Sequence, residues 1–200
     1  MKQFAKTLQI IAVSSGLLAA APVWAHGGTG LAGGFSSGFA HPVSGTDHML
    51  AMVSVGLWGA FLGRPLLYLL PVMFPMVMVI GAVLGMAGFP MFPVEPGIAL
   101  SLLVLGGCIA FAVRAPLIVA ATIVGLFAIF HGYAHGRELP SALDPVGYSL
   151  GFVLSTGLLH VAGIAMGWIK DHPGGEIAVR ATGGLIGTAG IFLVASLATR

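Results

Sequence analysis

The sequence predicts an all-α membrane protein, a bundle of about six transmembrane helices that follows a cleaved signal peptide. Three observations lead to this fold class. Of the 200 residues, 58% are hydrophobic and only 7% are charged, whereas a soluble domain carries roughly a quarter charged residues. Apolar runs recur along the chain at close to the roughly 20 residues that cross a bilayer core. The few basic residues fall mostly between these runs.

The first element, residues 1–25, has the organisation of a secretory signal. Two lysines form a charged start, and an apolar stretch follows them. Val23 and Ala25 occupy the two positions at which cleavage requires small side chains. We therefore expect the mature chain to begin at His26. An uncleaved first helix is the alternative.

The rest of the chain divides into a short glycine-rich segment and a membrane domain. Residues 27–40 are rich in glycine and too short to span, and we expect 26–43 to form an outer-face segment: a linker, an interfacial segment or a re-entrant loop packed against protein. The transmembrane helical domain is expected over 44–200, with spans at about 46–63, 66–88, 97–113, 115–132, 145–169 and 177–198. The 31 glycines predict close approach between helices, because small residues allow tight contact in lipid.

The positions of the basic residues predict the direction in which these spans cross the membrane. If the mature N-terminus lies outside, four of them fall in cytoplasmic turns: Arg64, Arg114, Lys170 and Arg180. The outer side then carries only Arg137 and the terminal Arg200. This bias agrees with the positive-inside rule and with the signal peptide. We expect a multi-pass protein of a bacterial inner membrane, with its mature N-terminus on the periplasmic side.

Composition also excludes several function classes. The net charge of +2 is dispersed, and the absence of a basic stripe with interleaved aromatic residues argues against nucleic acid as a partner. The single cysteine, Cys108, forms no internal disulfide. The sequence contains neither a P-loop nor a dinucleotide fingerprint, and no serine nucleophile motif is visible. The sequence leaves the oligomeric state open.

The first polar cluster is the stretch HPVSGTDH at the start of the first span. It supplies three potential metal ligands, His41, Asp47 and His48. Ser44 followed by Asp47 is also typical of a variant capping box, in which both side chains satisfy free backbone amides at a helix start. This local role competes with metal binding for Asp47, but it does not account for the two histidines.

The second cluster is the stretch FHGYAHGRE at the end of the fourth apolar run. His131 and His135 stand at i and i+4, so on a helix they project from one face about one turn apart. This geometry suits two imidazoles on one metal ion, and Glu138 would act as a ligand or orient one. The glycine after each histidine leaves room beside the imidazoles. Taken alone, the motif also fits a polar helix end that faces water.

The predicted topology places both motifs at outer ends of spans. If the first and fourth spans pack together, five or more nitrogen and oxygen ligands meet on one side of the membrane. The C-terminal end of the fourth span favours a cation, and Asp47 would offset the opposite dipole of the first span. Ionisable groups at membrane depth are costly unless they are paired or used. Imidazole and carboxylate without thiolate suit nickel, cobalt or zinc.

Three further histidines lie outside the two motifs. His160 falls near the middle of the fifth predicted span, where it either bonds to a neighbouring helix or lines a metal pathway. His26, once exposed by cleavage, would offer an amine and an imidazole to an outer metal ion. His172, in an inner turn, is expected to be solvated, with a metal exit as the alternative.

Together the two motifs resemble those of the HupE/UreJ family of membrane proteins. The likeness rests on the patterns H-x5-D-H and FHGxAHGxE, which occur here in the family order and extend over essentially the whole mature chain. The resemblance implies uptake of nickel or cobalt that serves maturation of hydrogenase or urease. It also implies a metal-handling set that consists of His41, Asp47, His48, His131, His135 and Glu138.

The sequence therefore predicts a secondary permease for a divalent transition-metal ion, with nickel first, cobalt next and zinc as a further choice. Its partners would be the metal ion and membrane lipid. Two alternatives stay open. One is an intramembrane hydrolase that holds zinc and uses a carboxylate base, and the other is a metal-binding accessory or sensor protein. An enzyme retains its metal through purification, whereas a carrier releases it.

Overall fold

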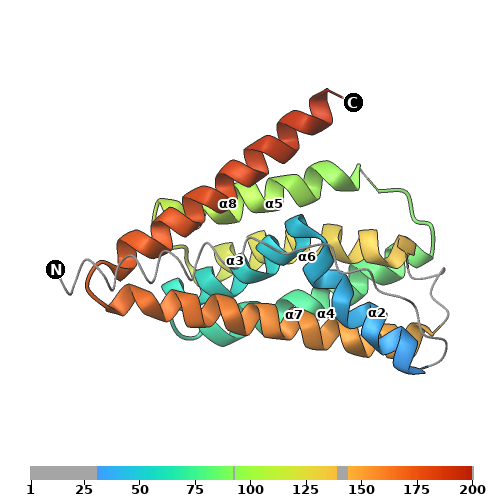
Figure 1. Ribbon diagram of the computed structural model, residues 1–200. Helices are drawn as coiled ribbons and strands as arrows, with labels where there is room; N and C mark the ends of the chain where they lie inside the picture. Colours follow the sequence, from blue (N-terminus) through green and yellow to red (C-terminus); the bar gives the residue numbers. More distant parts are fainter. Residues whose placement is uncertain (1–30, 92, 139–143, 200) are drawn as a thin grey trace.

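The computed structural model describes residues 31–91, 93–138 and 144–199. Its helices are α2 (Leu31–Ser44), α3 (Thr46–Leu62), α4 (Leu66–Met86), α5 (Val94–Ala110), α6 (Leu117–Glu138), α7 (Pro145–Trp168), the short η2 (Ile169–Asp171) and α8 (Gly175–Ala198) (Figure 1). This part of the chain contains no strand, and the all-α prediction is confirmed for it. The predicted signal peptide and His26 lie outside the described residues.

Each of the six predicted spans overlaps one of the helices α3 to α8. The ends of α3, α4, α7 and α8 agree with the predicted ends to within two residues. Helix α6 continues six residues beyond the predicted end at 132, so the whole second motif is helical. Four helices, α4, α6, α7 and α8, are long and apolar enough to cross a membrane, and α5 is apolar but shorter. The count of six spans therefore stays a prediction.

Helix α3 forms the centre of the bundle. Every residue from His48 to Phe61 is buried, so this helix presents apolar groups on all sides rather than on one stripe. It packs on α7, α4 and α5, and in Figure 1 it lies between α5 and α7. The indole of Trp58 donates a hydrogen bond to the Val113 carbonyl at 3.2 Å. The first motif is therefore attached to the most enclosed helix.

Glycines join the surrounding helices in pairs. Gly81 and Gly85 of α4 and Gly132 and Gly136 of α6 all lie in the contact between these two helices, and a Cβ on any of the four would overlap backbone atoms of the opposite helix. Close approach of this kind is a common basis of helix association in lipid. Similar contacts join other helix pairs, at Gly38, Gly56, Gly106, Gly151, Gly163 and Gly190. The predicted packing role of the glycines is confirmed at these positions. The two motif glycines make room for the backbone of α4, and Gly132 also lines a cavity beside His135.

Helix α2 forms where the sequence predicted only a short outer segment. It lies across the beginning of α7, the blue helix over the orange one in Figure 1. The backbone of Tyr148 occupies the space that a side chain on Gly38 would need, and the Phe35 carbonyl does the same at Gly151. The glycines that made this segment resemble a linker therefore allow it to pack as a helix.

The junction between α2 and α3 differs from the predicted capping box. The Ser44 hydroxyl donates to the carbonyl of His41 at 2.8 Å, so it closes α2. The residue at the start of α3 is Gly45, which offers no side-chain cap. The prediction is wrong for Ser44 because its hydroxyl finds an acceptor in the preceding helix. Asp47 does bond to a free amide, since its Oδ1 accepts from the His48 N–H at 2.8 Å.

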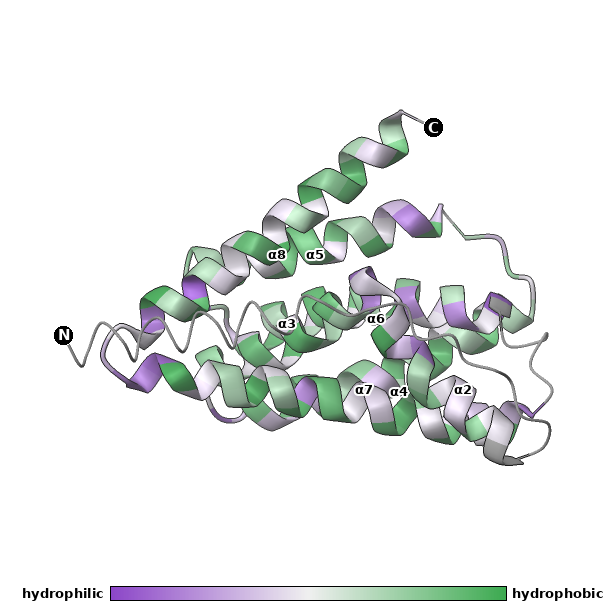
Figure 2. Ribbon diagram, viewed as in Figure 1, coloured by the Kyte–Doolittle hydropathy of each residue, from purple (hydrophilic) through white to green (hydrophobic). Residues whose placement is uncertain are grey.

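The outer surface of the bundle is largely apolar. Large exposed side chains on α4, α7 and α8 include Val72, Ile80, Leu150, Leu158, Leu185 and Phe192. Figure 2 shows that polar residues concentrate towards the helix ends and turns. At the end that carries the predicted cytoplasmic turns, Arg180 donates to the Ala110 carbonyl at 2.9 Å, and Arg114 lies over the Phe61 ring. Such a surface suits acyl chains around the middle and water at both ends.

Candidate metal centre

Four histidines from three helices meet near the end of the bundle opposite those basic turns. His41 lies in the last turn of α2, His48 in the first turn of α3, and His131 and His135 one turn apart on α6. The His48 ring centroid is 4.6 Å from that of His135 and 5.2 Å from that of His131. His41 reaches His135 at 4.9 Å. The structure thus brings the histidines of the two predicted motifs together as one histidine cluster.

The cluster forms although α3 and α6 do not pack tightly on each other. Helix α3 rests on α7, and α6 rests on α4. The imidazoles extend across the gap: His48 Nδ1 lies 3.3 Å from His131 Nδ1 and 3.1 Å from His135 Nε2. One ring nitrogen of a neutral imidazole holds either a single proton or a single lone pair. It cannot form a full hydrogen bond with both neighbours, so the two compete for it.

Ser101 on α5 indicates which nitrogen of His131 carries the proton. Its hydroxyl donates to the Ile98 carbonyl at 2.6 Å, so its oxygen is free to accept from His131 Nε2–H at 3.1 Å. With the proton on Nε2, Nδ1 keeps a lone pair that faces His48. Sequence reasoning missed Ser101, although a hydroxyl side chain inside an apolar run was the available signal.

We expect Ser101→Ala to weaken Ni²⁺ binding to the purified protein by about 10–100-fold, the usual cost of losing a group that orients a metal ligand. Ser101→Thr keeps the hydroxyl and is expected to restore affinity. Isothermal titration calorimetry measures both. The control is Ser54→Ala, which removes another fully buried hydroxyl, one that bonds only to Leu50 within α3. Wild-type affinity in Ser101→Ala would contradict the tautomer assignment.

Aromatic rings form the walls of the histidine cluster. The Phe152 ring lies 4.6 Å from that of His135 and 5.3 Å from that of His48. Phe74 covers the inner side of His131 at 5.8 Å. His131 is 1% exposed and His48 5%, whereas His41 and His135 are only partly buried. The cluster is therefore closed towards the bundle interior and more accessible on the side of His41 and His135.

Helix dipoles favour positive charge at this position. Helices α2 and α6 both end at the cluster, with His41 and His135 in their last turns. The C-terminal end of a helix carries a partial negative charge that stabilises cations nearby. Helix α3 begins there with the opposite sign, and Asp47 in its first turn opposes that effect. The local field thus suits a cation.

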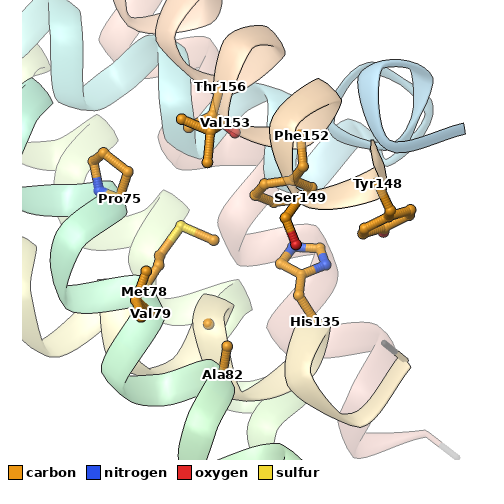
Figure 3. A pocket seen from close by; sticks show the side chains of 11 residues that line it. Pro75, Met78, Val79, Ala82, His135, Tyr148, Ser149, Phe152, Val153 and Thr156 are labelled. Carbon is orange, nitrogen blue, oxygen red and sulfur yellow. The ribbon is translucent and has the colours of Figure 1, made fainter. Parts of the chain in front are cut away.

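A cavity of about 110 Å³ borders the cluster between α4, α6 and α7. In Figure 3, His135 and Tyr148 lie on one side of it and Thr156 on another, with Met78 and Phe152 between them. The wall is mostly apolar, and the space is large enough for several water molecules. Its lining includes Val79, Ser149 and Val153, which are exposed on the outer surface of the bundle, so it is a partly open groove between α4 and α7 beside His135.

Two predicted carboxylate ligands are not shown to join the cluster. Asp47 uses Oδ1 to hold the backbone amide of His48, and no described contact links it to the imidazole rings. Glu138 is the last residue of α6, and its side chain lies outside what the structure describes. Among the described side chains, no three histidines, cysteines or acids are already arranged around one point as metal ligands.

The additional histidines have separate positions. His160 is buried in α7 and is 1% exposed. The Phe74 ring lies between it and the cluster, at 5.7 Å from His160 and 5.8 Å from His131. His172 is exposed in the turn after η2, at the opposite end of the bundle. Neither belongs to the four-histidine group.

Comparisons with known proteins agree with the two motifs. The model of a family described as HupE / UreJ protein matches residues 13–193. Protein HupE of Rhizobium leguminosarum bv. viciae is 43% identical over 176 residues, which cover 88% of this chain and 92% of that protein. No solved structure matches the chain.

Proposed function

The chain belongs to the HupE/UreJ family, and from this premise we propose that it is a secondary permease for a divalent transition-metal ion. The proposed ion is nickel, with cobalt next and zinc as a further choice. We propose that the imported metal is used in the maturation of hydrogenase or urease. The observation that carries the proposal is the convergence of His48, His131 and His135 within an otherwise apolar bundle.

The spacing of these nitrogens suits shared ligation. Two nitrogens bound to one first-row ion at about 2.0–2.1 Å lie about 2.9–3.4 Å apart, depending on the angle between them. The separations in the cluster are 3.1 and 3.3 Å. Small ring rotations would direct three lone pairs at one ion and remove the competition for His48 Nδ1. His41, Asp47 and Glu138 are the proposed additional ligands, and water would complete the shell.

The proposed direction of transport follows from the distribution of charge. The chain is a multi-pass membrane protein with several apolar helices. We assign it to a bacterial inner membrane with the cluster facing the periplasm, because the basic turns lie at the other end. The ion would lose part of its hydration shell at the histidine cluster and then pass inwards along α7 towards His160.

The two other functions have weaker support. A zinc hydrolase needs a bound water at an open position and a carboxylate base beside it. Asp47 and Glu138 are the candidates for that base, and Asp47 is instead held by a backbone amide. A sensor or accessory protein would bind the ion without moving it. The buried imidazole of His160, further along α7 from the cluster, favours movement.

Reconstitution tests the proposed function directly. We expect purified protein in liposomes that contain a Ni²⁺-sensitive dye to admit Ni²⁺ faster than protein-free liposomes, and added Co²⁺ to compete. Tight binding without flux would favour the sensor. Stoichiometric zinc that survives purification, together with no flux, would favour the hydrolase. Either result would reject a permease.

A further inference from the structure

A stripe of side chains on α7 leads inwards from the histidine cluster. Tyr148, Phe152, Thr156 and His160 follow one another at four-residue spacing, so they share one face of the helix. Tyr148 and Phe152 contact His41 at the outer end. His160 lies eight residues after Phe152, roughly 12 Å further along the axis at 1.5 Å per residue. The stripe changes from aromatic to polar as it enters the bundle.

The two inner members of this stripe have polar atoms without hydrogen-bond partners. Thr156 is fully buried and its Oγ1 makes no hydrogen bond within the described part of the chain, and the same holds for both ring nitrogens of His160. In a bilayer, a buried polar group that is not satisfied costs several kcal/mol. Polar side chains are retained at such a depth mainly where they handle a solute or an ion.

A third polar group comes from α4. Pro75 has no N–H, so the carbonyl of Pro71, four residues earlier, loses its usual partner inside the helix. Helix α4 contacts α7 at this depth, since Phe74, three residues after Pro71, packs against the His160 ring at 5.7 Å. An imidazole, a hydroxyl and a carbonyl oxygen are thus grouped in the interior, and each offers a lone pair.

Phe74 separates this inner group from the outer cluster. Its ring is fully buried and lies 5.8 Å from the His131 ring and 5.7 Å from the His160 ring. It occupies the segment of α4 between Pro71 and Pro75, where the intrahelical bonding is weakened. The groove beside His135 is lined by Pro75, which follows Phe74 in α4, and by Thr156.

We propose that His160, Thr156 and the Pro71 carbonyl form a second, weaker site for the transported divalent cation, with Phe74 as the barrier between it and the histidine cluster. The inference rests on the proposed transport function and adds a site to it. One imidazole and two neutral oxygens bind a first-row ion less tightly than several imidazoles do. Conduction requires such a site, because an ion that binds too tightly does not leave.

Two measurements on the purified full-length protein test this site. Equilibrium dialysis of the wild type is expected to detect two bound Ni²⁺ ions per protein molecule, one bound tightly (the tight equivalent) and one bound more weakly (the weaker equivalent). Thr156→Val keeps the side-chain shape and His160→Leu keeps an apolar side chain of similar size. Each is expected to retain the tight equivalent, lose the weaker one and reduce liposome flux by about tenfold or more. Ser155→Ala, beside Thr156 on α7 and also buried, is the control and is expected to change neither.

The outcomes separate the second site from the proposed function. A weaker equivalent and wild-type flux that persist in both Thr156→Val and His160→Leu would overturn the second site, while the permease would stand. Absence of flux in the wild type would reject the permease, and the dialysis data would still decide whether the interior binds the ion. Loss of the tight equivalent in Thr156→Val would also overturn the proposal, since the two sites would then be one.

Discussion

Cells that carry His131→Ala are expected to accumulate Ni²⁺ no faster than cells without the protein, and His48→Ala is expected to have the same effect. His131 Nδ1 and His48 Nδ1 are buried and 3.3 Å apart. Removal of either imidazole leaves the remaining nitrogens too few to replace the hydration shell. We expect the uptake rate to fall by more than the roughly 10–100-fold loss that follows when a residue that only orients a metal ligand is removed. Uptake of radioactive Ni²⁺, normalised to the amount of protein in the membrane, measures it.

His172→Ala is the matched control for these variants. It removes an imidazole from the same chain, but one that is exposed at the opposite end of the bundle. We expect uptake close to that of the wild type. Undiminished accumulation in both His131→Ala and His48→Ala would show that the cluster does not handle the ion. Equal losses of uptake in all three variants would show that removal of any histidine lowers uptake, whether or not it belongs to the cluster.

Gly132→Ala is expected to destabilise the packing of α6 on α4. A Cβ at this position would overlap the Met78 backbone of α4, so the two helices have to move apart. Overpacking of this kind costs about 1–3 kcal/mol. The separation would also displace His131 and His135, which flank Gly132 in the sequence. We expect a lower thermal denaturation midpoint in detergent and reduced Ni²⁺ flux.

Gly125→Ala provides the comparison within the same helix. The nearest atom to an added Cβ there is Met73 Cε at 3.8 Å, an ordinary contact distance. Alanine favours a helix over glycine by up to about 1 kcal/mol, so the midpoint is expected to stay unchanged or rise. If Gly132→Ala were as stable as Gly125→Ala, close approach at the motif glycine would have no structural importance.

Helix positions were largely readable from the sequence, because apolar runs in a membrane protein coincide with helices. Hydropathy does not predict the end of a helix that continues beyond its apolar run. Backbone hydrogen bonds carry α6 through the polar second motif to Glu138, although the predicted span stops at 132. Helix α2 was missed for a related reason: its glycines and its 14-residue length indicate a linker, and only contact with α7 makes a helix favourable.

The candidate site was only partly predictable. The charge pattern and helix order placed both histidine motifs at the same end of the bundle, but their meeting depends on imidazoles that reach across the gap between α3 and α6. The contributions of Ser101 and Phe74 could not be foreseen, because local periodicity does not encode which side chains from distant helices meet. Asp47 is a predicted metal ligand for which a local contact competes with metal binding. Its carboxylate has a backbone amide within reach, and the sequence alone cannot decide between that amide and a metal.

The glycine contacts have a consequence for how an ion is released. They fasten α4 to α6 and α2 to α7 as two stiff blocks, with α3 attached to the second through Gly56 and Gly163. His131 and His135 belong to the first block, whereas His41 and His48 belong to the second. A rocking movement between the blocks would lengthen the nitrogen–nitrogen separations without unfolding any helix. In the proposed permease, affinity for the ion would then depend on the angle between the two blocks, because the histidine cluster takes its imidazoles from both.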